Sequence, residues 1–151
     1  MIHRRQNGFT LVELMTVVVI VAVLASLAVP SYREYMRRAS RSEAKAVLLE
    51  DVQFLERIRT VSNAYSVNGS GDAITEDSLP VKQSPKEGQA RYNIKFVEDS
   101  LTPTTFTLIA EPIDPGPMAG DKCGTFTVNE LGTKGITGGA SGVTAADCWN
   151  K

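Results

Sequence analysis

The amino-acid sequence predicts an α+β protein in which one long N-terminal α-helix packs on a small antiparallel β-sheet. Two observations support this prediction. An apolar run near the N-terminus continues into an amphipathic helical pattern, and the second half of the chain holds short segments that alternate apolar and polar residues. Helices and strands differ in these periodicities. Because the helical part and the strands are segregated along the chain, the class is α+β.

The apolar run extends from Phe9 to Val29, 21 residues in which Glu13 is the only ionisable side chain. At about 1.5 Å rise per residue, such a helix spans the hydrocarbon core of a bilayer. A carboxylate inside it costs on the order of 3 kcal/mol when unpaired. The next arginine along the helix is Arg33. We therefore expect Glu13 to pair with a chain terminus.

The first eight residues form a short basic leader. A secretory signal peptide or a simple membrane anchor begins in the same way. However, the apolar run is too long for the apolar region of a signal peptide. We favour a cut between Gly8 and Phe9, because glycine lets the backbone enter a protease cleft closely. This cut places the new Phe9 amine about one helical turn from Glu13.

The N-terminal motif Gly8-Phe9-Thr10-Leu11-Val12-Glu13 resembles the processing site of type IV prepilins and type II secretion pseudopilins. The resemblance implies a membrane-embedded aspartyl prepilin peptidase that cuts after Gly8 and N-methylates Phe9. It also implies that Glu13 pairs with the N-terminal amine of a neighbouring subunit during filament assembly. Opposite charges attract strongly in an apolar medium, so a mispaired register is costly. The first two segments of the chain are thus predicted to be a leader (residues 1–8) and the half of the helix that spans the membrane and later takes part in assembly (residues 9–29).

The second half of the helix is predicted over residues 30–62. Its apolar residues recur mostly at three- and four-residue steps, which indicates one buried face. Pro30 is the expected bend or point of local unwinding. The expected buried face comprises Tyr32, Met36, Ala39, Val47, Phe54, Ile58, Val61 and Tyr65, widened by Leu48, Val52 and Leu55.

A basic row lies on the same half of the helix. Its members, at steps of four residues, are Arg33, Arg37, Arg41 and Lys45. One interpretation is a solvated face with local ion pairs. The other is a contact surface for lipid headgroups before assembly, or for acidic residues of neighbouring subunits afterwards. Both interpretations stay open.

Residues 63–151 form the predicted globular head. A turn-rich connecting segment from Ser62 to Gly88 is expected to fold over the sheet, with Ile74 and Leu79 as anchors. An antiparallel meander should follow, and its apolar face should cover the helix around Val47 to Ile58. The predicted strands are Tyr92–Phe96, Thr105–Ala110, Thr125–Asn129 and a short edge strand around Lys134–Thr137.

Cys123 and Cys148 are the only cysteines, and the only histidine lies in the leader. Two thiols alone cannot form a four-ligand zinc site. For a chain that crosses a membrane, a disulfide is favoured over two buried free thiols. The disulfide would clip the glycine-rich segment that begins at Gly135 to the sheet, with Trp149 either packed or displayed.

The two cysteine regions extend the resemblance. The disulfide-bounded region of PilE-type minor pilins is similar to Cys123-Gly124-Thr125-Phe126-Thr127 together with Ala146-Asp147-Cys148-Trp149. This similarity favours a minor pilin over a major pilin. It also argues against a pseudopilin, because pseudopilins often lack the bridge.

The motifs of common enzymes are missing from the sequence, so we expect a structural protein without a cofactor or metal. There is no Walker A loop and no Gly-x-Ser-x-Gly elbow.

Basic residues flank the apolar run on both sides, so charge alone leaves its orientation open. The resemblance implies an inner-membrane prepilin with a cytoplasmic N-terminus and a periplasmic head. After assembly, the resemblance implies that the chain is part of an extracellular pilus that serves adhesion, twitching motility or DNA uptake.

A pilin that binds DNA during transformation is an alternative, as is a secretion pseudopilin. Without the leader, 14 basic residues face 17 acidic ones, a net charge near −3 that excludes binding driven by bulk charge. A DNA-binding head would instead need an exposed basic patch. Its candidate lysines are Lys82, Lys86, Lys122, Lys134 and Lys151.

Overall fold

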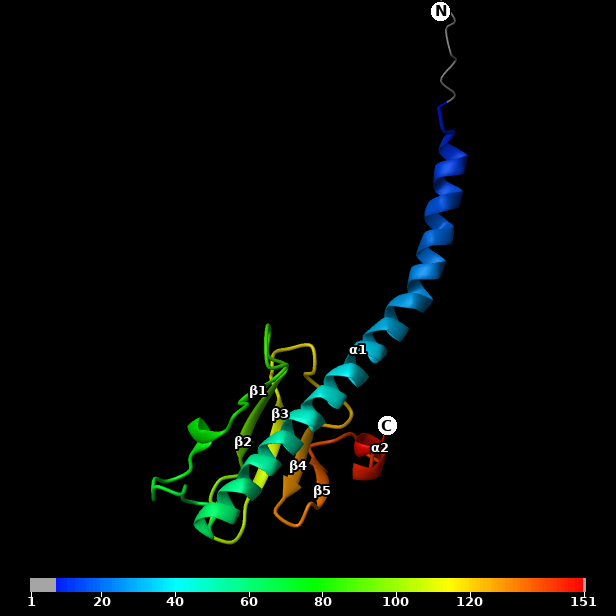
Figure 1. The fold of residues 1–151 in the computed structure, drawn as a ribbon. Coiled ribbons are helices and arrows are strands. Elements are labelled where there is room, and N and C mark those ends of the chain that lie inside the picture. The colour runs from blue at the N-terminus through cyan, green and yellow to red at the C-terminus, as the bar shows by residue number, and fades with distance from the viewer. Residues whose placement is uncertain (1–7, 151) are drawn as a thin grey trace, which may run out of the picture. The chain divides into compact units, whose positions relative to one another are not determined.

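The computed structural model describes residues 8–150. The first seven residues of the expected leader and Lys151 lie outside this range. The chain divides into two units within its long helix, after Met36. The elements, in chain order, are α1 (Leu11–Ser62), η1 (Glu76–Ser78), β1 (Gln83–Ser84), β2 (Tyr92–Phe96), β3 (Thr107–Pro112), β4 (Thr125–Asn129), β5 (Lys134–Thr137) and α2 (Ala145–Trp149) (Figure 1).

The long helix α1 runs as one α-helix from Leu11 to Ser62, close to the expected bounds. Pro30 lies inside it, and the helix does not unwind there. A proline removes one backbone hydrogen bond from a helix interior. In a helix of 52 residues, the backbone hydrogen bonds before and after Pro30 keep the chain helical at this point.

The head contains a five-stranded sheet in the order β1-β2-β3-β4-β5, antiparallel throughout. The predicted meander is confirmed, and the bounds of β2, β4 and β5 agree with the prediction. Register is set by pairs such as Ile94 with Ala110, and Ala110 with Phe126. The residues of these pairs lie on one face of the sheet, because side chains alternate along each strand.

The prediction for β3 was wrong by two residues at each end. The Thr102 N–H donates to the Thr105 carbonyl (2.9 Å), and the Thr105 N–H donates to Thr102 Oγ1 (2.9 Å), so the chain is still turning at Thr105. Phe106 is buried before the strand begins. At the other end, Pro112 pairs with Tyr92 at the margin of the ladder, where a missing N–H is tolerated.

Three short elements were not predicted: η1, β1 and α2. β1 has two residues, too few for an alternating pattern. α2 has five residues and begins with a capping box: the Asp147 N–H donates to Thr144 Oγ1 (3.3 Å), and the Thr144 N–H donates to Asp147 Oδ2 (3.2 Å). The sequence signal for it was Thr-x-x-Asp, a variant of the usual Ser/Thr-x-x-Glu pattern.

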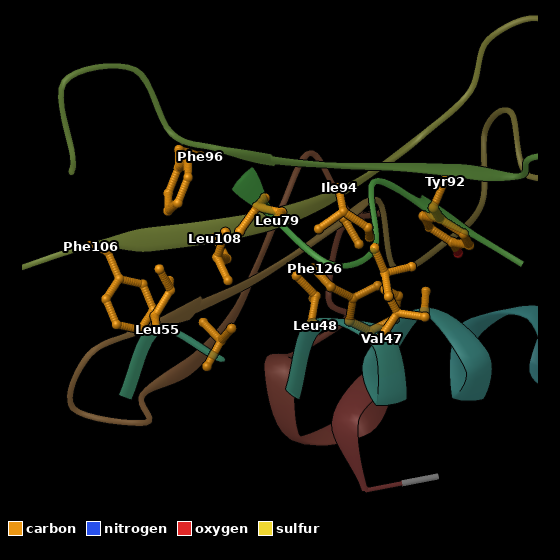
Figure 2. Packing of buried hydrophobic residues seen from close by; sticks show 14 of the residues in the cluster. Val47, Leu48, Leu55, Leu79, Tyr92, Ile94, Phe96, Phe106, Leu108 and Phe126 are labelled. Atoms are coloured by element: carbon orange, nitrogen blue, oxygen red, sulfur yellow. The ribbon is translucent and has the colours of Figure 1, made fainter. Parts of the chain in front are cut away.

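The hydrophobic core lies between the second half of α1 and one face of the sheet (Figure 2). α1 contributes Ala44, Val47, Leu48 and Leu55. The alternate residues of the strands that face them are Tyr92, Ile94, Phe96, Leu108, Ala110, Phe126 and Val128. Burying each large apolar side chain contributes roughly 1.5–3 kcal/mol, which makes this layer the main source of stability in the head.

The connecting segment closes the core, as predicted, because Ile74 and Leu79 are both buried. The buried face expected on the second half of α1 extended too far at both of its ends. Tyr32 is 64 % exposed and Val61 is 75 % exposed. Tyr65 is buried, but it lies beyond the end of α1, where its ring meets that of Phe106 edge to face.

Candidate functional site

The first half of α1 has no partner for its apolar surface within the described chain. From Phe9 to Val29 the large apolar side chains are between 47 % and 89 % exposed. The hydroxyls of Thr16 and Ser26 donate to the carbonyls of Val12 and Val23, so the helix satisfies them itself. By its length and its composition alone, α1 qualifies as a helix that could cross a membrane. Such a surface needs lipid or other apolar helices around it.

Glu13 has a local partner that the sequence analysis missed. Its Oε2 accepts hydrogen bonds from the Thr10 N–H (2.9 Å) and the Thr10 hydroxyl (2.9 Å), and its own N–H donates to Thr10 Oγ1 (3.2 Å). This is a capping box, and Thr-x-x-Glu was its sequence signal. The bonds fix the carboxylate at the positive end of the helix. Both bonds fall on Oε2, and among the described residues Oε1 accepts no hydrogen bond.

Gly8 and Phe9 precede the first residue of α1. Both are exposed, and Phe9 reaches 89 %. A side chain added at Gly8 would meet nothing within 4 Å. The peptide bond between these residues therefore joins two exposed residues and lies outside regular helix.

The C-terminal segment is clipped to the head by a disulfide between Cys123 and Cys148, whose Cα atoms are 5.8 Å apart. Trp149 is packed rather than displayed: its ring meets that of Phe126 edge to face (5.6 Å), and its Nε1–H donates to the Gly135 carbonyl (2.9 Å). Lys45 Nζ donates to the carbonyls of Cys148 (3.0 Å) and Trp149 (3.1 Å). The second half of α1 thus holds the end of the chain.

Replacing Cys148 with serine should lower the stability of the head by about 3–4 kcal/mol, because the bridge closes a loop of about 26 residues. Trp149, the only tryptophan, reports unfolding of this segment by its fluorescence. Urea unfolding of the oxidised protein, of the reduced protein and of Cys148→Ser measures the effect. Equal midpoints for the oxidised protein and the variant would contradict it.

The basic row does not form one contact surface. Arg41 is buried, and its guanidinium binds the buried Asp121 carboxylate, with Nε donating to Oδ2 (2.9 Å). Lys45 binds the C-terminal segment, whereas Arg33 is exposed and Arg37 is half-buried. The interpretation as a subunit contact is therefore wrong for Arg41, because a core facing the sheet lies under that part of the helix.

Asp121 joins α1 to the start of the disulfide loop. Its Oδ2 also accepts the Cys123 N–H (3.2 Å). Burial raises the pKa of this carboxyl, but the hydrogen bonds from Arg41 and from the Cys123 N–H outweigh burial and hold the pKa below its ordinary value. The carboxylate is therefore charged at neutral pH and keeps the Arg41 charge compensated.

Of the five candidate DNA-contacting lysines, Lys151 lies outside the described residues, and the other four do not gather at one edge of the sheet. Lys82 pairs with Asp77 and Lys86 with Glu50, next to edge strand β1. Lys134 lies in β5, the opposite edge, with Nζ 5.2 Å from the centre of the Trp149 ring. Lys122 is exposed near the first cysteine.

Basic side chains also lie on the side of the head that carries α2. Burial lowers the pKa of Lys45, and the nearby charges of Arg41 and Lys134 lower it further. Two lysines, Lys45 and Lys134, thus lie beside the C-terminal segment, and Lys134 is the more accessible, whereas the buried Arg41 charge is compensated by Asp121. Among the described residues, no group of three or more histidine, cysteine or acidic side chains is placed to hold a metal ion.

Comparisons with known families give two matches that together cover residues 3–127. Residues 30–127 match the family described as type IV minor pilin ComP, DNA uptake sequence receptor. Residues 3–29 match the prokaryotic N-terminal methylation motif. The first match lies mostly in the head, and the second lies in the leader and the apolar half of α1.

Individual relatives cover most of the chain. It is 31 % identical over 128 residues to the type IV major pilin protein PilE1 of Neisseria gonorrhoeae, covering 85 % of this chain and 72 % of that protein. It is 32 % identical over 135 residues to the type IV major fimbrial protein FimA of Dichelobacter nodosus (89 % and 72 %). The crystal structure of the Neisseria meningitidis non-core minor pilin PilV has the same fold, with a TM-score of 0.51 at 23 % identity (73 % and 94 %).

Proposed function

This chain belongs to the type IV pilin family, and we propose that it is a minor pilin that serves DNA uptake. As a type IV pilin it is a subunit of a pilus, in a family that is structural rather than enzymatic. The match to the ComP family over residues 30–127 carries the finer proposal. That match covers most of the head, which distinguishes pilins from one another, rather than the N-terminal motif they share.

Processing is proposed to occur between Gly8 and Phe9. A prepilin peptidase would remove the leader and methylate the Phe9 amine. The match to the N-terminal methylation motif and the exposure of both residues support this step. The apolar half of α1 would then stay in the inner membrane, with the head on the periplasmic side. An oxidising compartment suits the Cys123–Cys148 disulfide.

Assembly is proposed to move the apolar half of α1 from lipid into a filament of pilin helices. The exposed surface from Leu11 to Val29 supports this, because it has no cover within the described chain. Glu13, with Oε1 open beyond its capping box, would bind the Phe9 amine of a neighbouring subunit. In an apolar medium this pair favours one register over the others.

DNA contact is proposed on the side of the head that carries α2 and β5. Phosphates attract lysines, and each neutralised phosphate adds to the salt dependence of binding. Lys134 is exposed there, and the half-buried Lys45 lies against the same C-terminal segment. The lysines near β1 are less suited, because Lys82 and Lys86 already pair with Asp77 and Glu50.

Replacing Lys134 with glutamine should weaken DNA binding and reduce the slope of log affinity against log salt by about one. The matched control Lys82→Gln, at the opposite edge of the sheet, should change neither. Fluorescence anisotropy of labelled duplex DNA with the full-length protein in detergent micelles measures both. If the unaltered protein shows no salt-sensitive binding, the role in DNA uptake is wrong, whereas membership of the pilin family is unaffected.

A further inference from the structure

Asp51 is a carboxyl buried in the second half of α1. Its exposed fraction is 0 %, and it lies on the helix face that also carries the core residues Leu48 and Leu55. Oδ1 accepts one long hydrogen bond from the Val81 N–H (3.3 Å). Oδ2 has no hydrogen-bond partner among the described residues. Val81 belongs to the connecting segment, so this bond joins that segment to α1.

The charged groups around Asp51 do not compensate it. The charges that act on Asp51 are those of Glu50 on α1 and of Lys86 just after β1, but these two side chains pair with each other. Lys82, next to Val81, pairs with Asp77 instead. An ionised Asp51 would therefore be a buried charge without an ion-pair partner in the described chain, which is unfavourable.

Burial is the main cause that raises the pKa of Asp51, to about 7 from an ordinary 3.8. The Val81 N–H and Lys86 lower it, and Glu50 raises it. A folded-state pKa above the unfolded value means that the native head binds an extra proton between these two pH values. The stabilisation is complete below about pH 4, falls as the pH rises to about 7, and is lost above it.

We propose that Asp51 is a pH-dependent lock, which in its protonated form holds the connecting segment (residues 62–88) on α1 and in its ionised form weakens that hold. Ionisation strengthens the hydrogen bond from Val81, because the acceptor becomes charged. It also leaves a charge in the core with Oδ2 unsolvated, which costs more. Opening of the segment lets water reach the carboxylate. This proposal is independent of the proposed role in DNA uptake.

Hydrogen exchange of the Val81 amide tests the lock directly. The full-length processed protein in detergent micelles is compared at pH 5.5 and pH 8, with each rate corrected for the intrinsic pH dependence of exchange. Linkage with pKa values of about 7 closed and 3.8 open predicts roughly thirtyfold more protection at pH 5.5. Equal corrected protection at the two pH values would overturn the proposal without any variant.

Three variants identify the titrating group. In Asp51→Asn the pH dependence should disappear, with the fold checked by Trp149 fluorescence. In Glu50→Gln and Asp77→Asn, which change exposed carboxylates on α1 and in the connecting segment, it should persist. Persistence in a folded Asp51→Asn protein, or loss in Glu50→Gln, would assign the effect to another group and overturn the proposal.

Discussion

Replacing Glu13 with alanine should lower the recovery of this pilin in sheared filaments by about tenfold or more, with its processing unchanged. The physical reason is the loss of the carboxylate that is proposed to bind the neighbour's Phe9 amine in an apolar medium. A tenfold loss corresponds to about 1.4 kcal/mol, well within the strength of a charge-assisted hydrogen bond. Immunoblots of sheared filaments and of membranes, compared as a ratio, measure the effect.

Two further variants separate the charge of Glu13 from its capping role. Glu13→Gln keeps an acceptor for Thr10 but removes the charge, and it should assemble as poorly as the alanine variant. Thr10→Val keeps the charge but removes the hydroxyl that binds Oε2. It should have the milder effect, because a lost cap costs about 1 kcal/mol. Unchanged recovery of Glu13→Ala in filaments would contradict the pairing.

Replacing Asp121 with alanine should destabilise the head by about 3–5 kcal/mol, because the buried Arg41 charge loses its partner. Urea unfolding followed by Trp149 fluorescence measures the change. The apolar double variant Arg41→Met with Asp121→Leu should recover most of the stability, since no charge remains buried. Asp77→Ala breaks an exposed pair with Lys82 and serves as the control, because an exposed pair contributes little to stability.

The pH dependence of the Arg41–Asp121 pair follows from the lowered pKa of Asp121. A carboxyl whose pKa is lower in the folded state stabilises the head above its unfolded pKa. That contribution is lost as the pH falls through the folded value. The unaltered protein should therefore lose stability in acid below about pH 4, and Asp121→Ala should lose less. Parallel acid titrations of the two proteins would contradict the assignment.

Elements with a clear period were predictable from the sequence. The strands at 92–96 and 125–129 alternate strictly between core and surface, and their bounds agree with the structure. The predicted start of β3 came too early because the Thr102–Thr105 turn contains threonines, which also favour strands. β1 and α2 were missed because elements of two and five residues show no period.

The candidate site was predictable where local sequence determines it. The two cysteines allow one intramolecular pairing, and the structure contains it. The roles that the N-terminal motif predicts for Gly8, Phe9 and Glu13 stay predictions. The partners of Arg41 and Lys45 were not predictable, because Asp121 and the carbonyls of α2 are about 80 and 103 residues away along the chain. A periodic row of cations on a helix looks the same in sequence whether it faces solvent or the end of its own chain.

Mass spectrometry of sheared, purified pili tests the central claim, that this chain is processed and assembled as a minor type IV pilin. The result expected is a chain that begins at N-methylated Phe9, carries the Cys123–Cys148 disulfide and is a small fraction of the pilin in the filament. Recovery of the chain only in membranes, still beginning at Met1, would contradict the claim.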